Sequence, residues 1–100
     1  MSLTILREIE GILEERPIDK LIVKALINEL RRKLSEYVLI DEMMRKKYGM
    51  SFEEFKAKNI VKEKGYSFEV ESDYCDWELA IDGIKTIKEK IEKLEKLLRV

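Results

Sequence analysis

The residues from Tyr66 to Asp82, YSFEVESDYCDWELAID, combine six carboxylates and four aromatic rings with no basic residue. Carboxylates create a field that attracts a basic partner, and aromatic side chains supply large contact areas at low entropic cost. The segment therefore predicts a surface that binds another protein, although Tyr74 and Trp77 fit equally well as core residues near the start of a helix. The residues expected to contact the partner are Tyr66, Phe68, Glu69, Val70, Glu71, Tyr74, Asp76 and Trp77.

Enzymatic chemistry has little support in the sequence. The chain has no histidine to act as a general base or metal ligand, no glycine-rich phosphate loop, and one cysteine without a recognisable base beside it. Asp73, Asp76 and Asp82 form the one acidic cluster without interleaved lysines, but a helical magnesium-dependent hydrolase would need a second acidic pair on another helix. We therefore expect a non-catalytic protein without cofactor or metal, in which Asp73 caps a helix.

Nucleic-acid binding is a weaker alternative. Two basic triplets, residues 31–33 and 45–47, lie fourteen residues apart, which on a helix returns to nearly the same face after ~21 Å. Carboxylates at Glu29, Glu36 and Asp41 lie among them. A solvated face with internal ion pairs is therefore the expected arrangement.

The composition limits the chain to one small domain. It has 100 residues, 41% of them charged, and its 20 basic and 21 acidic residues nearly cancel. The Lys- and Glu-rich bias is typical of heat-resistant proteins. A lone Cys75 cannot form an internal disulfide, no signal peptide precedes the first helix, and no apolar run is long enough to span a membrane. We expect a cytoplasmic protein.

Two long apolar seams predict an all-α fold. Both repeat at alternating spacings of three and four, the heptad pattern of a helix that packs lengthwise against another helix. Such seams predict a long antiparallel helical hairpin resembling a coiled coil, but a heptad does not specify whether the partner helix belongs to the same chain. The first seam is Val23, Ile27, Leu30, Leu34, Tyr37, Asp41, Met44 and Tyr48, and the second is Trp77, Ala80, Ile84, Ile87, Ile91, Leu94 and Leu98.

The remaining elements follow from local signals. Gly49 suits a helix end, and Ser51 with Glu54 forms a capping box for the next helix, which Gly65 ends. Tyr66, Phe68 and Val70 alternate with polar residues, which favours an extended segment. The predicted elements of this single domain are helices at 1–15, 17–48, 51–64 and 73–99, with an extended linker at 65–72 and its strand-like part near 66–71.

Part of the sequence is similar to a known pattern. The pattern consists of the run KKYGMSFEEF, Lys46 to Phe55, then SFEVESDYCDWE, Ser67 to Glu78, and then a charged heptad helix. It resembles small helical archaeal and cyanobacterial proteins described as antitoxin components of toxin–antitoxin pairs. The resemblance covers roughly the last sixty residues, and Trp77 with Glu78 matches the family's Trp-Glu pair. It implies a partner toxin, often a small basic ribonuclease, that the acidic-aromatic segment would neutralise.

Self-association is a further expectation. The apolar face of the first helix and the apolar start of the second exceed what a thin hairpin can cover, so we expect a homodimer built largely from residues Leu3 to Leu34. The alternative to an antitoxin-like protein is a structural or self-associating helical protein whose acidic segment is simply solvated.

Overall fold

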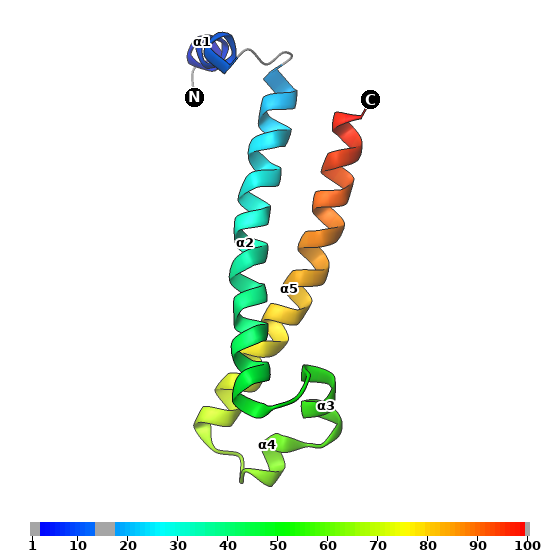
Figure 1. Ribbon diagram of the computed structural model, residues 1–100. Helices are drawn as coiled ribbons and strands as arrows, with labels where there is room; N and C mark the ends of the chain where they lie inside the picture. Colours follow the sequence, from blue (N-terminus) through cyan, green and yellow to red (C-terminus); the bar gives the residue numbers. More distant parts are fainter. Residues whose placement is uncertain (1–2, 14–17, 100) are drawn as a thin grey trace.

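A computed structural model describes residues 3–13 and 18–99, and within these residues the protein consists of helices and turns without a strand (Figure 1). The all-α prediction is therefore confirmed. None of the helices in these two ranges combines the length and apolar composition needed to cross a membrane. The helices are α1 (Leu3–Leu13), α2 (Ile18–Tyr48), α3 (Phe52–Ala57), α4 (Ile60–Glu63) and α5 (Phe68–Leu98).

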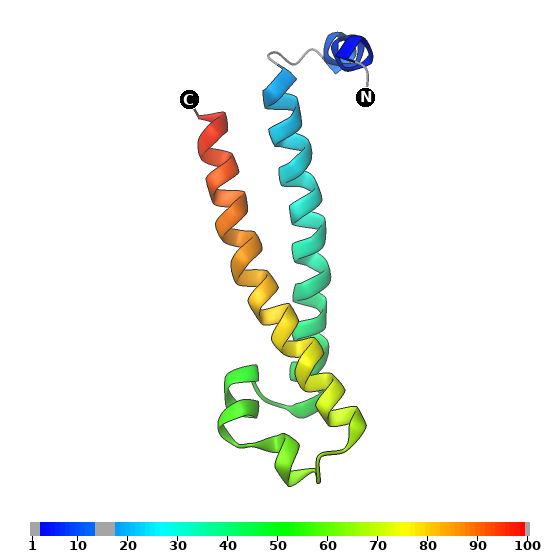
Figure 2. The same cartoon turned by 180° about the vertical axis from the view of Figure 1, so that it is seen from behind.

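The two long helices, α2 and α5, pack against each other as an antiparallel hairpin within one chain (Figures 1 and 2). Trp77 stacks on Tyr48 with ring centroids 6.0 Å apart, while Leu94 and Leu98 pack near Ile27 at the other end. The heptad seams therefore mate intramolecularly, which the sequence left open. The molecule is elongated, 59 × 26 × 18 Å, with α3 and α4 at one end and α1 near the other.

The turn after α2 has the chemistry that the sequence predicts. Gly49 adopts φ +67° and its N–H donates to the carbonyl of Arg45 at 2.7 Å, which closes α2. Ser51 is the N-cap of α3, and its Oγ accepts a hydrogen bond from the N–H of Glu54 at 3.2 Å. The predicted N-cap at Ser51 is therefore confirmed, and the Glu54 carboxylate accepts from the Ser51 hydroxyl at 3.4 Å.

The single helix predicted over 51–64 is broken into α3 and α4. Asn59 takes the left-handed conformation, with φ +52°, between the two short helices. Asparagine tolerates this conformation better than most residues because its short polar side chain can bond locally. The break lets Phe52 and Phe55 on α3, and Ile60 on α4, all reach the core.

The prediction of an extended segment near residues 66–71 is wrong, because α5 begins at Phe68. Gly65 and Tyr66 are consecutive left-handed residues, and the Tyr66 N–H donates to the carbonyl of Val61 at 2.9 Å, as in a Schellman helix ending. The N-cap of α5 is Ser67, whose Oγ accepts from the N–H of Val70 at 3.3 Å. Asp73, predicted to be this cap, lies inside the helix.

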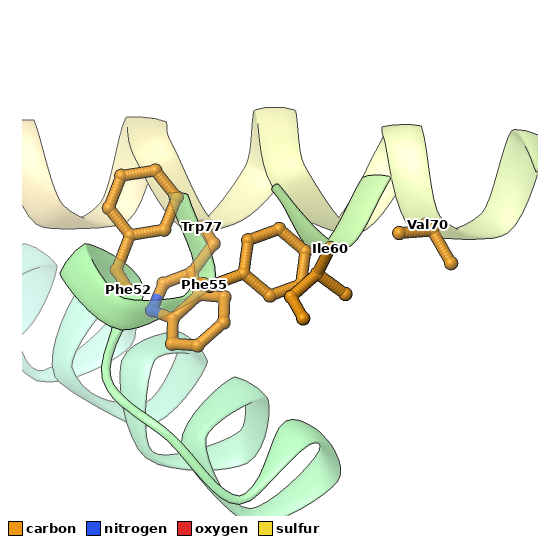
Figure 3. Packing of buried hydrophobic residues seen from close by; sticks show 5 residues of the cluster. All are labelled: Phe52, Phe55, Ile60, Val70 and Trp77. Carbon is orange, nitrogen blue, oxygen red and sulfur yellow. The ribbon is translucent and has the colours of Figure 1, made fainter. Parts of the chain in front are cut away.

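The core has two clusters along the hairpin. The aromatic cluster lies where α3 and α4 pack against the start of α5 (Figure 3), and the isoleucine cluster lies between α2 and the second half of α5. Among the side chains that the structure describes, no polar one is buried. The aromatic cluster is Phe52, Phe55, Ile60, Val70 and Trp77, and the isoleucine cluster is Ile27, Ile87 and Ile91.

Between these clusters the helices meet at Gly83. A Cβ on Gly83 would lie 2.4 Å from Cε2 and 2.6 Å from Cδ2 of the Tyr37 ring. These distances are far inside van der Waals contact, so the ring of Tyr37 occupies the space that a side chain on α5 would need. A glycine therefore lies inside a helix where propensity alone would favour alanine.

We predict that Gly83→Ala lowers the free energy of unfolding by about 1 kcal/mol, because overpacking costs ~1–3 kcal/mol and outweighs the gain of ~1 kcal/mol in helix propensity. Chemical denaturation followed by circular dichroism measures the change. In a Tyr37→Ala background the same substitution should become stabilising. Equal effects in both backgrounds would show that Tyr37 does not limit the approach of the helices.

Candidate partner-binding surface

The eight residues predicted to contact a partner separate into buried and exposed positions. Trp77 is 0% exposed and Val70 is 8% exposed, so both belong to the core and are unavailable to a partner in this fold. Tyr74 is half-buried against Phe52 and Phe55. The other five are exposed: Tyr66, Phe68, Glu69, Glu71 and Asp76.

Trp77 is held by a polar contact as well as by packing. Its indole Nε1–H donates to Oδ1 of Asp41 at 2.9 Å, and its ring lies 5.2 Å from Phe55 and 5.3 Å from Phe52 between centroids. Asp41 is the one polar position of the first heptad seam, and it also accepts from Nε of Arg45 at 3.2 Å. The polar residue that interrupts the first seam therefore supplies the hydrogen-bond acceptor for Trp77 of the opposite helix.

Glu69 belongs to a polar network that ties α5 to the end of α2. The Nζ of Lys47 lies 2.6 Å from carboxylate oxygens of both Glu69 and Asp73, and the Tyr48 hydroxyl donates to Asp73 at 2.5 Å. Since Glu69 is already paired with Lys47, it contributes less free charge to a binding surface than the sequence suggests.

The network shifts the titration of its members. Burial raises the pKa of Asp73, but the hydrogen bonds from Lys47 and Tyr48 lower it more, so that the net pKa lies below 3.8. Burial and the bond to Asp73 raise the pKa of Tyr48 to about 12. Asp73 is therefore ionised at neutral pH and holds two donors from α2.

Three carboxylates of the segment lie along one outward face of α5, and one of them, Glu78, accepts a hydrogen bond from the Tyr74 hydroxyl at 3.3 Å. Residues 68, 71, 75, 78 and 82 recur at spacings of three and four, so they follow one face of the helix for about four turns. Phe68 begins this line and is 87% exposed. We call this surface the acidic row, and it consists of Phe68, Glu71, Cys75, Glu78 and Asp82, all exposed except Glu78, which is half-buried.

A pocket of about 520 Å³ lies beside the acidic row, between α5 and the segment that contains α3 and α4. Both of the non-glycine residues with left-handed backbone in the described ranges, Asn59 and Tyr66, line it. Such conformations are uncommon outside glycine and often occur at functional sites. The lining residues are Lys56, Asn59, Val61, Tyr66, Glu71, Tyr74 and Cys75.

The two sides of the pocket differ in charge. Lys56 lines the α3–α4 side and Glu71 lines the α5 side. Exposed lysines at positions 58, 62 and 64 lie on the same segment outside the pocket lining. Lys58 lies 3.9 Å from Glu54, a long and exposed ion pair. A partner in this pocket would therefore meet a negative wall on one side, a positive wall on the other, and tyrosine rings between them.

The sequence did not identify Lys56, Asn59 and Val61 as part of the site. They reach it because the chain breaks at Asn59 and reverses at Gly65 and Tyr66, and this geometry depends on packing against the aromatic cluster. Asparagine next to a charged helical run was the one available signal, since asparagine is enriched in left-handed turns.

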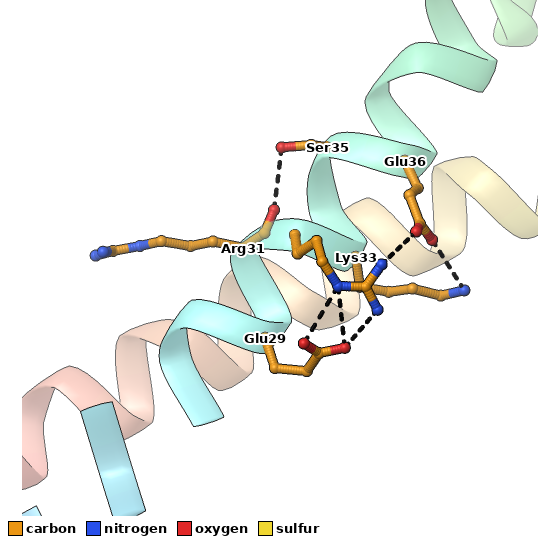
Figure 4. Close-up of polar contacts among 6 residues, drawn as sticks. Glu29, Arg31, Lys33, Ser35 and Glu36 are labelled. Atoms are coloured by element: carbon orange, nitrogen blue, oxygen red, sulfur yellow. Dashed lines mark hydrogen bonds and ion pairs between the residues drawn. The ribbon is translucent and has the colours of Figure 1, made fainter. Parts of the chain in front are cut away.

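The basic triplets of α2 are largely occupied by ion pairs, and Figure 4 shows the first triplet beside Glu29 and Glu36. Five of their six side chains contact carboxylates, as expected for a solvated face. Little uncompensated positive charge therefore faces outward from α2. The pairs are Arg31 with Glu95, Arg32 with Glu29 and Glu36, Lys33 with Glu36, Arg45 with Asp41, and Lys47 with Glu69 and Asp73.

No cluster of three or more His, Cys, Asp or Glu side chains suited to a metal ion occurs in the described part of the chain. Comparison with known proteins adds no assignment. No family model matches the chain, and neither the curated proteins nor the solved structures provide a match. The function must therefore be argued from the surface itself.

We predict that Asp73 makes the protein more sensitive to acid. The pKa of Asp73 is lower in the folded protein than the ~3.9 expected for an unfolded chain. Its contribution to the free energy of unfolding is therefore fully present above the unfolded pKa and is lost as the pH falls through the folded pKa. Between about pH 6 and about pH 3, the urea midpoint of Asp73→Asn should therefore fall less than that of the wild type.

The control is Glu53→Gln, which removes one exposed carboxylate from α3. It should keep the acid sensitivity of the wild type. If Asp73→Asn and the wild type lose stability in parallel as the pH falls, the Lys47–Tyr48–Asp73 contacts do not contribute as described.

Proposed function

We propose that the protein is a non-catalytic interaction module that binds a basic partner protein through the acidic row and the adjoining pocket. The observation that carries the proposal is Phe68, which is 87% exposed at the head of a lysine-free line of carboxylates. The partner would bury Phe68 and place its basic groups along Glu71, Glu78 and Asp82.

The energetics of an exposed aromatic ring support this proposal. Covering a phenylalanine side chain yields roughly 1.5–3 kcal/mol, and such anchors dominate protein interfaces when charges surround them. Tyr66, 59% exposed, adds a second ring at the pocket. The carboxylates would contribute mainly to the association rate and to selection of a basic partner.

The sequence resemblance suggests the kind of partner. If the chain acts like the antitoxin-type proteins that it resembles, the partner is a small basic toxin, and α5 would lie across the toxin's RNA-binding cleft. A cleft that binds RNA phosphates is positively charged, so a helix face with three carboxylates and no lysine is complementary to it. Phe68 and the pocket would then fix the position of α5.

The test compares two charge reversals on the same helix. Glu71→Lys with Asp82→Lys reverses two exposed carboxylates of the acidic row. Glu89→Lys with Glu92→Lys makes the same change in net charge farther along α5 and removes only the exposed ion pair of Glu92 with Lys96. Glu69 is unsuitable because its reversal would also break the ion pair with Lys47.

We predict that the acidic-row variant binds the product of the adjoining gene at least ~10-fold more weakly, a loss of ~1.4 kcal/mol, while the control variant binds like the wild type. Phe68→Ser should cost about 2 kcal/mol of binding without changing the melting temperature. Titration calorimetry and growth rescue during co-expression provide the measurements. Equal rescue by both variants, or an adjoining product that is harmless and does not bind, would refute the proposal.

A further inference from the structure

The two flanks of the hairpin, on either side of the seam, differ in polarity. On one flank, Lys24, Asn28 and Arg31 of α2 lie beside Glu95 and Arg99 of α5, and Arg31 pairs with Glu95 at 3.4 Å. On the other flank, both helices expose large apolar side chains. This apolar flank contains Ile22, Leu26, Met43, Leu79 and Leu97, which are 48–60% exposed.

Helix periodicity and local contacts place these residues together. Because the seam repeats every seven residues, positions seven apart keep the same relation to it. Ile22 and Met43 differ by three heptads, and Leu79 lines a hollow with Met43 near the closed end of the hairpin. Leu97 lines another hollow with Val23 near the open end. The flank therefore has an apolar patch at each end.

A charged belt separates the two patches. On α2 the heptad positions between Ile22 and Met43 are Glu29 and Glu36, whose side chains are 63% and 47% exposed. Lys33, seven residues after Leu26, lies between them on the same flank and pairs with Glu36 at 3.3 Å. On α5 the corresponding part of the flank holds Lys90 and Lys93, both exposed and without an ion pair to another described residue. The belt is therefore net acidic on α2, with two carboxylates and Lys33, and basic on α5.

We infer that a second copy of the chain covers the apolar flank, and that α2 of each copy packs antiparallel against α5 of the other in a four-helix bundle. A two-fold axis along the hairpin produces this arrangement. It places each apolar patch on its own counterpart and Glu29 opposite Lys90 and Lys93 of the second copy, with Glu36 about two turns farther along α2.

The charges select this arrangement over its alternative. An axis across the hairpin would also join apolar patches, but it would pack α5 against α5 and bring four lysines together at positions 90 and 93. Like charges placed opposite one another oppose association. Glu29 and Glu36 already contact Arg32 within one chain, and in the dimer they would be shared with the lysines.

The flank is large enough for a stable dimer. A 31-residue helix is about 46 Å long and two adjacent helices are about 20 Å wide, so the face offers roughly 900 Å² per chain. A standard interface buries about 800 Å² per partner. The interface differs from the one expected within Leu3 to Leu34, because half of it comes from α5. It leaves the acidic row uncovered, so this inference does not depend on the proposed function.

Sedimentation equilibrium of the full chain tests the inference. The wild type should have twice the mass of one chain at micromolar concentration, and Met43→Glu with Leu79→Glu should be monomeric while keeping the helical circular dichroism signal. The control, Glu71→Lys with Asp82→Lys on the acidic row, should remain dimeric. A monomeric wild type, or an unchanged dimer in the Met43 and Leu79 variant, would overturn the inference.

A charge swap tests the orientation of the helices. Lys90→Glu with Lys93→Glu should weaken the dimer at least tenfold, as should Glu29→Lys with Glu36→Lys, and all four changes together should restore it. If the lysine reversal instead strengthens association, or if the fourfold variant stays as weak as its parents, α2 does not face α5 of the second copy.

Discussion

The packing of Trp77, a residue of α5, against α2 is the contact on which the rest of the structure depends. Its ring fills the junction of α2, α3 and α5, and its N–H must find an acceptor once it is buried, because an unpaired buried donor costs ~1–3 kcal/mol. Asp41 supplies that acceptor at one point on α2. This bond favours one register of the two long helices, since a shift of one heptad would leave the buried indole N–H without this acceptor.

The hairpin was predictable because the regular spacing of apolar residues along the two long helices indicates which faces pack together. Ile87 and Ile91 of the second seam are buried against Ile27 of the first, as the heptad spacing indicates. The N-cap at Ser51 was predictable for a similar reason, because it depends only on residues three apart. Which chain supplied the partner helix was not predictable, because it depends on the path of the α3–α4 connection.

The error over residues 66–71 arose from a pattern that fits two structures. Alternation of Tyr66, Phe68 and Val70 suits an extended chain, but Val70 and Trp77 also lie one heptad apart and continue the seam of α5 toward its N-terminus. The helix is favoured because Ser67 can cap it and Gly65 can reverse the chain before it. With α5 beginning at Phe68, the helical periodicity directs Trp77 toward the core and Phe68 toward solvent. Phe68 therefore remains a candidate for partner binding, and Trp77 does not.

The uneven distribution of the core has a consequence for dynamics. The aromatic rings gather at the closed end of the hairpin, whereas the open end is held by aliphatic side chains between two helix termini. Local opening requires less free energy where fewer buried contacts must separate, so fraying should begin at the open end. The acidic row and its pocket lie at the end that opens last. A partner that binds there meets a surface already ordered, and little conformational entropy is lost when the complex forms.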